Sequence, residues 1–156
     1  MSKWKTYLPL AVSIAIPWGA AGLSFLLAGR GSMQQYGTLN QPPLAPPGWL
    51  FPVVWSVLYT LMGVSAWLVW KRRGRSRQQG QAYVLQLALN VLWTPVFFRL
   101  QRYWLAFGIL VALWLAIGSM ILRFRERSTS AALLQLPYLL WVTFAGYLNL
   151  AIAWRN

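Results

Sequence analysis

The chain has 156 residues, of which 58% are hydrophobic and 10% are charged, and its net charge is +13 because 14 basic side chains accompany one acidic side chain, Glu126. It contains no histidine and no cysteine. This composition excludes an ordinary soluble domain, a disulfide-stabilised fold and a metal centre built from histidine, cysteine and carboxylate ligands. It also excludes a catalytic triad, because no serine has a histidine or carboxylate partner to activate it.

Charged side chains are confined to short clusters, and five uncharged stretches lie between them. These are Thr6–Gly29, Gly31–Trp70, Gln78–Phe98, Tyr103–Leu122 and Ser128–Trp154. A helix needs about 20 apolar residues to cross a hydrocarbon core of about 30 Å, and each stretch reaches that length. The sequence therefore predicts an all-α membrane protein, a single domain over residues 1–156 that forms a bundle of five transmembrane helices.

The expected helices, in chain order, cover about residues 7–28, 49–70, 79–98, 103–122 and 130–154. The first resembles a signal peptide in following Lys3 and Lys5. However, its 22 residues are long for the apolar region of a signal peptide, and Ala28-Gly29-Arg30 is a poor cleavage site. We therefore expect it to remain in the protein as a transmembrane helix.

The connection between the first two helices, Gly29–Gly48, is longer than a plain connection requires. It holds Pro42, Pro43, Pro46 and Pro47, which a spanning helix would not tolerate, so the second helix begins near Trp49. These prolines favour extended and turn conformations, and we expect an ordered loop that caps the bundle. The alternative is a loop on the membrane surface with no lid role.

The basic residues are unequally divided between the two sides of the membrane. If spans alternate in direction, ten lie on the side of the N-terminus: Lys3, Lys5, Lys71, Arg72, Arg73, Arg75, Arg77, Arg123, Arg125 and Arg127. Four lie on the other side: Arg30, Arg99, Arg102 and Arg155. The positive-inside rule places the N-terminus in the cytoplasm and the proline-rich loop outside. We expect the Lys71–Arg77 cluster to attract anionic lipid headgroups, and not nucleic acid, at about 1 kcal/mol per basic residue.

Eleven tryptophans are several times what a membrane anchor needs. Six lie near span ends, where amphipathic rings are favoured: Trp4, Trp49, Trp67, Trp70, Trp104 and Trp154. The other five lie inside spans, where each indole N–H needs a partner: Trp18, Trp55, Trp93, Trp114 and Trp141. All but Trp114 lie between the midplane and the proline-rich loop. We interpret this set as an aromatic cavity that opens toward the loop, although bulky core packing explains any single one equally well.

The third predicted helix carries a polar face. Gln86, Asn90, Trp93, Thr94 and Phe97 recur at helical spacing and share one side. Uncharged amides at this depth either join helices or bind a ligand, and both interpretations stay open. No span contains an ionisable carboxylate, imidazole or amine, which disfavours proton-coupled transport. The function that remains after these exclusions is the binding of a flat or bulky apolar ligand by stacking.

Small residues recur every four positions on the first and fourth helices. They are Ala11, Ala15 and Gly19, and Gly108, Ala112 and Ala116. Such stripes let helices approach closely, either within one bundle or between two subunits.

Several ordered blocks resemble one family, the tryptophan-rich sensory proteins and translocator proteins (TspO), formerly called peripheral benzodiazepine receptors. The blocks are Tyr36 with Leu39 and Pro42, Pro46–Pro52 followed by Trp55, Leu58 and Tyr59, then Asn90–Phe98, and Pro137–Trp141 leading to Leu148 and Asn149. The resemblance implies a homodimer whose pocket, capped by the loop after the first helix, binds porphyrins such as protoporphyrin or haem, sterols and drug-like ligands, with no covalently bound cofactor and no metal site. The expected ligand-binding residues are Tyr36, Pro46, Phe51, Trp55, Tyr59, Asn90, Trp93, Thr94, Trp141, Ala145 and Leu148.

The resemblance has functional consequences and two departures. The expected function is a receptor or sensor of tetrapyrroles, which regulates porphyrin handling or stress signalling. A bacterial cell membrane is the expected location, and an outer membrane or an organelle is the alternative. The alternatives are a passive porphyrin or lipid carrier and a light-dependent porphyrin-degrading enzyme, for which Trp55 and Trp141 are the candidate catalytic residues.

The first departure is in the loop, where Leu44 stands in place of the usual tryptophan and Gln41 in place of the usual lysine. The second is on the fifth helix, where the sterol-binding pattern fails because the first basic residue after Tyr147 is Arg155.

Overall fold

The computed structural model describes residues 3–72 and 77–156. Within them every element of regular secondary structure is a helix, and five segments are long and apolar enough to cross a membrane. These segments are α1 (Trp4–Ala28), α3 (Leu50–Trp70), α4 (Arg77–Phe98), α5 (Tyr103–Arg125), and the pair α6 (Thr129–Leu134) and α7 (Leu136–Arg155). The prediction of an all-α bundle of five transmembrane helices is therefore confirmed, and the chain is a multi-pass membrane protein.

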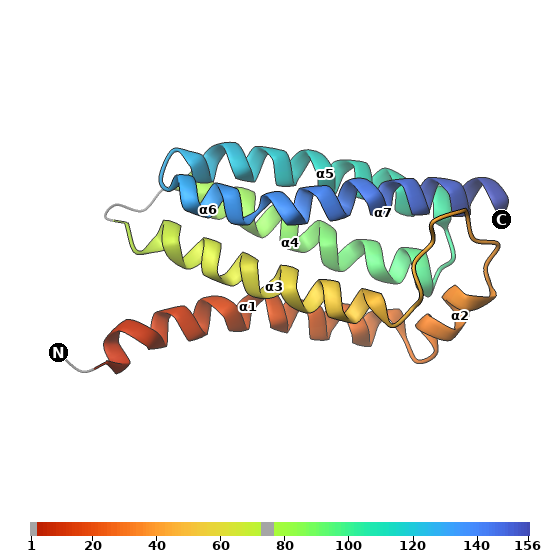
Figure 1. Ribbon diagram of the computed structural model, residues 1–156, viewed down its shortest axis with the longest axis horizontal. Helices are drawn as coiled ribbons and strands as arrows, with labels where there is room; N and C mark the ends of the chain where they lie inside the picture. The colour runs from red at the N-terminus through yellow and green to blue at the C-terminus, as the bar shows by residue number, and fades with distance from the viewer. Residues whose placement is uncertain (1–2, 73–76) are drawn as a thin grey trace.

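The five spans form a closed ring (Figure 1). One side of α1 packs against α3 and the other against α4, α4 packs against α5, and α5 packs against α7. The ring closes where α3 contacts α6, the short helix that precedes α7. The start of α1 and the α5–α6 connection lie at one end of the bundle, whereas α2 (Ser32–Thr38) and the end of α7 lie at the other, which we call the loop end.

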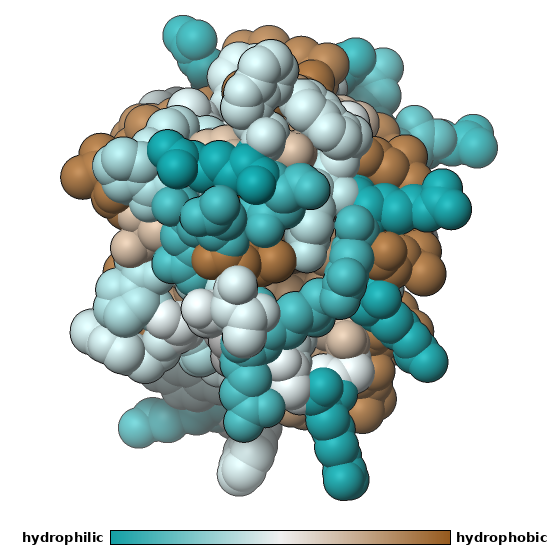
Figure 2. Space-filling view, turned by 90° about the vertical axis from the view of Figure 1, so that its right-hand side faces the viewer, coloured by the Kyte–Doolittle hydropathy of each residue, from teal (hydrophilic) through white to brown (hydrophobic). Residues whose placement is uncertain are grey.

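Hydrophilic side chains cover the loop end, and hydrophobic side chains lie around the flanks of the bundle (Figure 2). Arg30, Arg99, Arg102 and Arg155 are all exposed and follow or precede helix termini at this end, as alternating spans require. This arrangement suits a protein whose flanks face lipid and whose ends face water. The assignment of the opposite end to the cytoplasm stays a prediction.

The last span differs from the single helix expected over residues 130–154. It is interrupted at Gln135, where α6 ends and α7 begins. Pro137 follows in the first turn of α7, where it has no N–H to donate and its ring opposes a continuous helix. The start of α6 is capped by Ser128, whose Oγ accepts a hydrogen bond from the backbone N–H of Ala131 at 3.2 Å.

The connection after α1 also differs from the prediction, which expected only extended and turn conformations. Ser32–Thr38 form the helix α2, and the extended backbone begins at Leu39. The prolines start only at Pro42, so they do not restrict the residues of α2. Gly29 and Gly31 adopt φ of 86° and 83°, which side chains disfavour, and these two glycines let the chain turn out of α1 into α2.

At Gly63 of α3, the helix α1 packs very closely against α3. The Ser13 hydroxyl donates to the Gly63 carbonyl at 2.7 Å. A Cβ atom at Gly63 would meet the backbone of Ile14 and lie 2.8 Å from its Cγ1. Only glycine therefore allows α1 to pack this closely on α3, and α1 supplies one wall of the interior described below.

We predict that Gly63→Ala separates α1 from α3 and destabilises the bundle by about 1–3 kcal/mol, the usual cost of overpacking. Thermal unfolding in detergent, followed by circular dichroism, measures the loss. Gly118→Ala is the matched control, because a Cβ atom there meets nothing within 4 Å. Equal unfolding temperatures for the two variants would contradict the prediction.

Candidate functional site: a capped aromatic cavity

A cavity of about 500 Å³ lies inside the half of the bundle nearest the loop end. This volume falls within the range of about 300–1,000 Å³ that is typical of small-molecule sites. Residues of α1, α2, α3, α4, α5 and α7 line it, so the whole ring of helices contributes to its wall. No charged side chain is among the described residues that line it.

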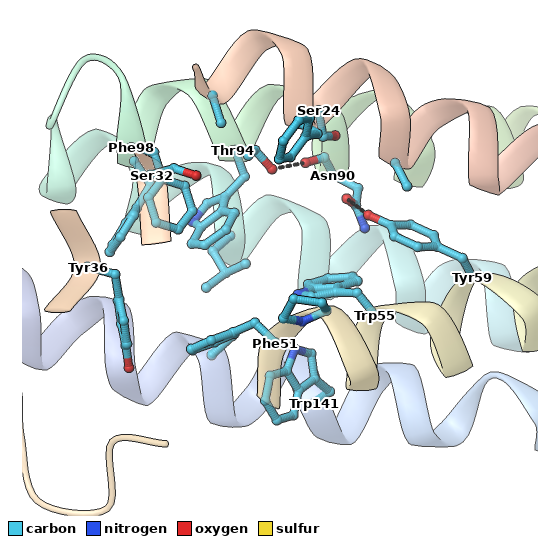
Figure 3. Close-up of a pocket in the computed structure, with 18 of the residues that line it drawn as sticks. Ser24, Ser32, Tyr36, Phe51, Trp55, Tyr59, Asn90, Thr94, Phe98 and Trp141 are labelled. Carbon is cyan, nitrogen blue, oxygen red and sulfur yellow. Dashed lines mark hydrogen bonds between the residues drawn. The ribbon is translucent and has the colours of Figure 1, made fainter. Parts of the chain in front are cut away.

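Aromatic rings form one continuous side of the cavity. Figure 3 shows Phe51 and Trp55 of α3 gathered with Trp141 of α7, across the cavity from Asn90 and Thr94 of α4. The Phe51 ring meets Trp141 edge-on, with centroids 5.8 Å apart. Trp55 stacks on Tyr59 at 5.4 Å. These rings present an apolar, polarisable surface to whatever occupies the cavity.

The interior tryptophans fall into two groups, as their predicted depth in the membrane suggests. Trp18, Trp55, Trp93 and Trp141 all line the cavity. Trp114 instead lies at a separate groove between α5 and α7, where its indole N–H donates to the Thr143 hydroxyl at 2.8 Å.

The indole N–H groups on the cavity wall differ in their partners. Trp18 donates to the Thr60 hydroxyl at 3.2 Å, and Trp93 donates to Oδ1 of Asn149 at 2.9 Å. The Nε1 atom of Trp141 is buried and has no partner among the described residues. A buried N–H without an acceptor destabilises the fold. Among the indoles of the wall, the Trp141 N–H therefore gains the most free energy when a ligand provides an acceptor.

The floor of the cavity is a hydrogen-bonded cluster centred on Asn90. Tyr59 donates to Oδ1 of Asn90 at 3.1 Å, and Nδ2 of Asn90 donates to the Tyr138 hydroxyl at 2.8 Å. Tyr138 in turn donates to Oε1 of Gln86 at 2.8 Å. Both amides of the polar face of α4 therefore join helices, and Asn90 also lines the cavity whereas Gln86 lies beneath it.

Ten of the eleven expected ligand-binding residues line the cavity. The exception is Pro46, whose carbonyl accepts a hydrogen bond from the Tyr36 hydroxyl at 3.3 Å. Burial raises the pKa of Tyr36, so this hydroxyl stays protonated and able to donate. Pro46 therefore positions a wall residue without touching the interior. Ligand binding by the other ten stays a prediction.

Sequence reasoning predicted Trp18 as part of the cavity but missed the rest of the contribution of α1. Its wall residues are Trp18, Ala21, Gly22, Ser24, Phe25 and Ala28. Except for Ser24, these follow the helical spacing of 3 and 4, but they are small or aromatic and carry no motif. Phe25 is 69% exposed and Trp18 44% exposed, so this side of the cavity is also open toward the flank of the bundle.

Comparison with known proteins agrees with this geometry. The model of the TspO/MBR family matches residues 11–155. The chain belongs to the TspO/MBR family. It is 41% identical to the tryptophan-rich sensory protein of Cereibacter sphaeroides, with 73% of the chain and 72% of the relative covered. It is 35% identical to the tryptophan-rich protein TspO of Chlorobaculum tepidum, with 100% and 99% covered, and 34% identical to the translocator protein of Ovis aries, with 85% and 80% covered.

In this TspO/MBR family member the connection after α1 adds Ser32 and Tyr36 of α2 to the cavity wall, and its extended part is bonded to the C-terminal part of the chain at two places. The Tyr147 hydroxyl donates to the Pro43 carbonyl at 2.8 Å. The side-chain amide of Asn156 exchanges two hydrogen bonds with the backbone of Asn40, each 3.3 Å long. The sequence predicts an ordered loop, and these bonds help to order it, whereas its role as a lid stays a prediction.

The first departure from the family pattern, at Gln41 and Leu44, falls in this loop. Gln41 donates to the Tyr36 carbonyl at 2.6 Å, so it has a structural role where lysine is usual. Leu44 is 82% exposed and has φ of 71°, a left-handed conformation that costs a branched side chain energy. The side chain at this position therefore packs against little of the described chain.

We predict that Tyr147→Phe loosens the loop without unfolding the bundle, because it removes one hydrogen bond worth about 0.5–1.5 kcal/mol. Hydrogen–deuterium exchange of residues 39–48 should become faster while the exchange of α5 is unchanged. Tyr7→Phe is the control, since Tyr7 is exposed on α1 at the opposite end. Identical exchange of the loop in both variants would mean that the Tyr147 bond does not hold it.

Proposed function

We propose that this protein is a membrane receptor or sensor that binds tetrapyrroles, such as protoporphyrin or haem, in the capped aromatic cavity, and that occupancy regulates porphyrin handling or stress signalling. The observation that carries the proposal is the cavity itself, an uncharged space of about 500 Å³ walled by four tryptophans. The name of the relative from Cereibacter sphaeroides, a tryptophan-rich sensory protein, agrees with a sensing role.

The chemistry of the wall suits a flat aromatic ligand. Each favourable ring contact adds about 0.5–1.5 kcal/mol beyond burial, so several such contacts suffice without iron ligation by histidine or cysteine. The unpartnered Nε1 of Trp141 can donate to a carbonyl or carboxylate of the ligand. Sterols and drug-like molecules can pack against the same apolar surface. The exposed α1 side gives such ligands a route from the bilayer.

A second candidate function rests on Trp55 and Trp141. Both rings line the cavity, and indoles are good electron donors to a photoexcited porphyrin. Light-dependent porphyrin breakdown needs no acid or base, and therefore suits a site that lacks both. Passive transport of porphyrin or lipid is a third possibility, in keeping with the name of the translocator protein from Ovis aries.

We predict that protoporphyrin quenches the intrinsic fluorescence of the protein, and that Trp141→Phe keeps the fold, weakens binding modestly and abolishes any light-driven breakdown. Phenylalanine retains a ring but lacks the N–H and is a poor electron donor. A titration in detergent gives the affinity, and absorption spectra after illumination give the photoproduct.

Trp114→Phe is the matched control, because Trp114 lies outside the cavity. Binding and photoproduct unchanged in Trp141→Phe would show that Trp141 is ordinary core. Binding retained with photoproduct lost would favour the enzyme. Quenching of the wild-type protein no stronger than that of free tryptophan would argue against the site.

The remaining partners are also proposals. Anionic lipids at Lys71–Arg77 are supported by the exposure of Lys71, Arg72 and Arg77, whereas Arg73 and Arg75 lie outside the described residues. A homodimer is supported by the stripe Ala11, Ala15 and Gly19, which is exposed on α1. The bacterial cell membrane is proposed from the relatives in Cereibacter sphaeroides and Chlorobaculum tepidum. In the second stripe, Gly108 and Ala112 are exposed but Ala116 is 6% exposed and packs within the bundle.

We predict that Ala15→Leu shifts the protein from dimer toward monomer in detergent, because a larger side chain prevents close approach of two α1 helices. Light scattering coupled to size-exclusion chromatography measures the mass. Leu8→Ile, an apolar change at an exposed position of α1, is the control. An unchanged dimer of folded Ala15→Leu would remove α1 from the interface.

A further inference from the structure

A second group of polar side chains lies beneath the cavity, toward the N-terminal end of the bundle. Gln79, Tyr83, Gln86 and Gln135 are each at most 2% exposed. Five of their polar atoms are buried and have no partner among the described residues: Oε1 of Gln79, the Tyr83 hydroxyl, Nε2 of Gln86, and both Oε1 and Nε2 of Gln135. Most buried polar groups in proteins are hydrogen-bonded, so this concentration requires an explanation.

These side chains share one region of the interior. Gln79, Tyr83, Gln86 and Asn90 follow one another at spacings of 4, 3 and 4, which places them on one face of α4. Gln135 lies three residues before Tyr138 at the break between α6 and α7. Tyr138 bonds directly to Gln86 and belongs to the same buried cluster as Tyr83.

Hydrogen bonds connect this group of side chains to the cavity floor at one end and to the surface near Glu126 at the other. At the upper end, Gln86 connects through Tyr138 and Asn90 to the floor of the cavity. At the lower end, Nε2 of Gln79 donates to the Arg123 carbonyl at 2.9 Å and to the Glu126 carboxylate at 3.4 Å. Glu126 is exposed at the N-terminal end of the bundle. Polar groups thus extend from the cavity floor to that surface.

We propose that this region is a hydrated column, in which bound water molecules connect Gln86, Gln135, Tyr83 and Gln79 and link the cavity floor to the Glu126 end. The unpaired atoms include two amide donors, two amide acceptors and a hydroxyl that does both. Water matches this mixture, since each molecule donates and accepts and a buried water makes about three hydrogen bonds. A bound cation matches only the oxygen atoms and a bound anion only the N–H and O–H donors, so neither satisfies the whole mixture.

The break at Gln135 fits the same explanation. Both polar atoms of this fully buried side chain lack partners, although an apolar residue would pack there without such a cost. The bilayer supplies no water from the flank of the bundle, so the water must enter from the N-terminal end. The column therefore gives the polar floor of an otherwise apolar cavity contact with solvent on the side opposite the loop.

Water-edited solid-state NMR of the full-length protein in bilayers tests the column without any ligand, so its outcome is independent of the proposed function. We expect magnetisation to pass from water to the side-chain amides of Gln86 and Gln135 as it does to exposed Gln81. Transfer to Gln81 but not to Gln86 and Gln135 would overturn the proposal.

A substitution gives a second readout whose sign distinguishes a wet interior from a dry one. If waters bridge these groups, Gln135→Met removes their anchor and lowers the unfolding temperature by at least about 2 °C. If the region is dry, the same change removes two unpaired polar atoms and raises the unfolding temperature, which would overturn the proposal. Met62→Leu, a volume-conserving change at a fully buried apolar position, is the control.

Discussion

The hydrogen bonds of Asn90 join three helices at one level of the bundle. Its amide connects Tyr59 of α3 with Tyr138 of α7, and both bonds are buried. The lipid around the bundle offers the amide and the two hydroxyls no hydrogen-bond partner, so these bonds hold the three helices together inside the bilayer. This level divides the interior. Above it the helices diverge around an aromatic cavity, and below it they enclose polar side chains that continue toward Glu126.

The cavity is bounded at its two ends by different kinds of structure. At the floor, side-chain hydrogen bonds hold the helices together, whereas at the loop end α2 adds Ser32 and Tyr36 to the wall. The loop is attached through its backbone, at the Pro43 carbonyl to Tyr147 and at the N–H and carbonyl of Asn40 to Asn156. Bonds to the backbone depend little on which side chain the loop carries. This explains how the loop tolerates Leu44 and Gln41 where the family pattern differs.

Much of this architecture follows from the sequence, because a bilayer imposes few solutions. Span length predicts the bundle, and the depth of Trp55, Trp93 and Trp141 predicts an aromatic interior. The spacing of Asn90 and Gln86 predicts a common face but not their roles, which depend on Tyr138 from a distant span. Gln135 escaped notice because a lone glutamine at the start of a span has no periodic pattern. The break beside it depends on how Pro137 is accommodated, and a proline within a span predicts a kink without fixing its place.

The distribution of unpaired polar atoms constrains how any ligand lies in the cavity. The amide of Asn90 and the indole N–H groups of Trp18 and Trp93 are already bonded within the protein. Among the described residues on the wall, the buried side-chain atoms without a partner are Nε1 of Trp141 on α7 and Oγ of Ser24 on α1. A ligand that leaves these groups unpaired loses more affinity than one that merely lacks a methylene. Selectivity among flat apolar molecules therefore depends on polar groups at the ligand's edge, which α1 and α7 can bond, and not on the bonded floor.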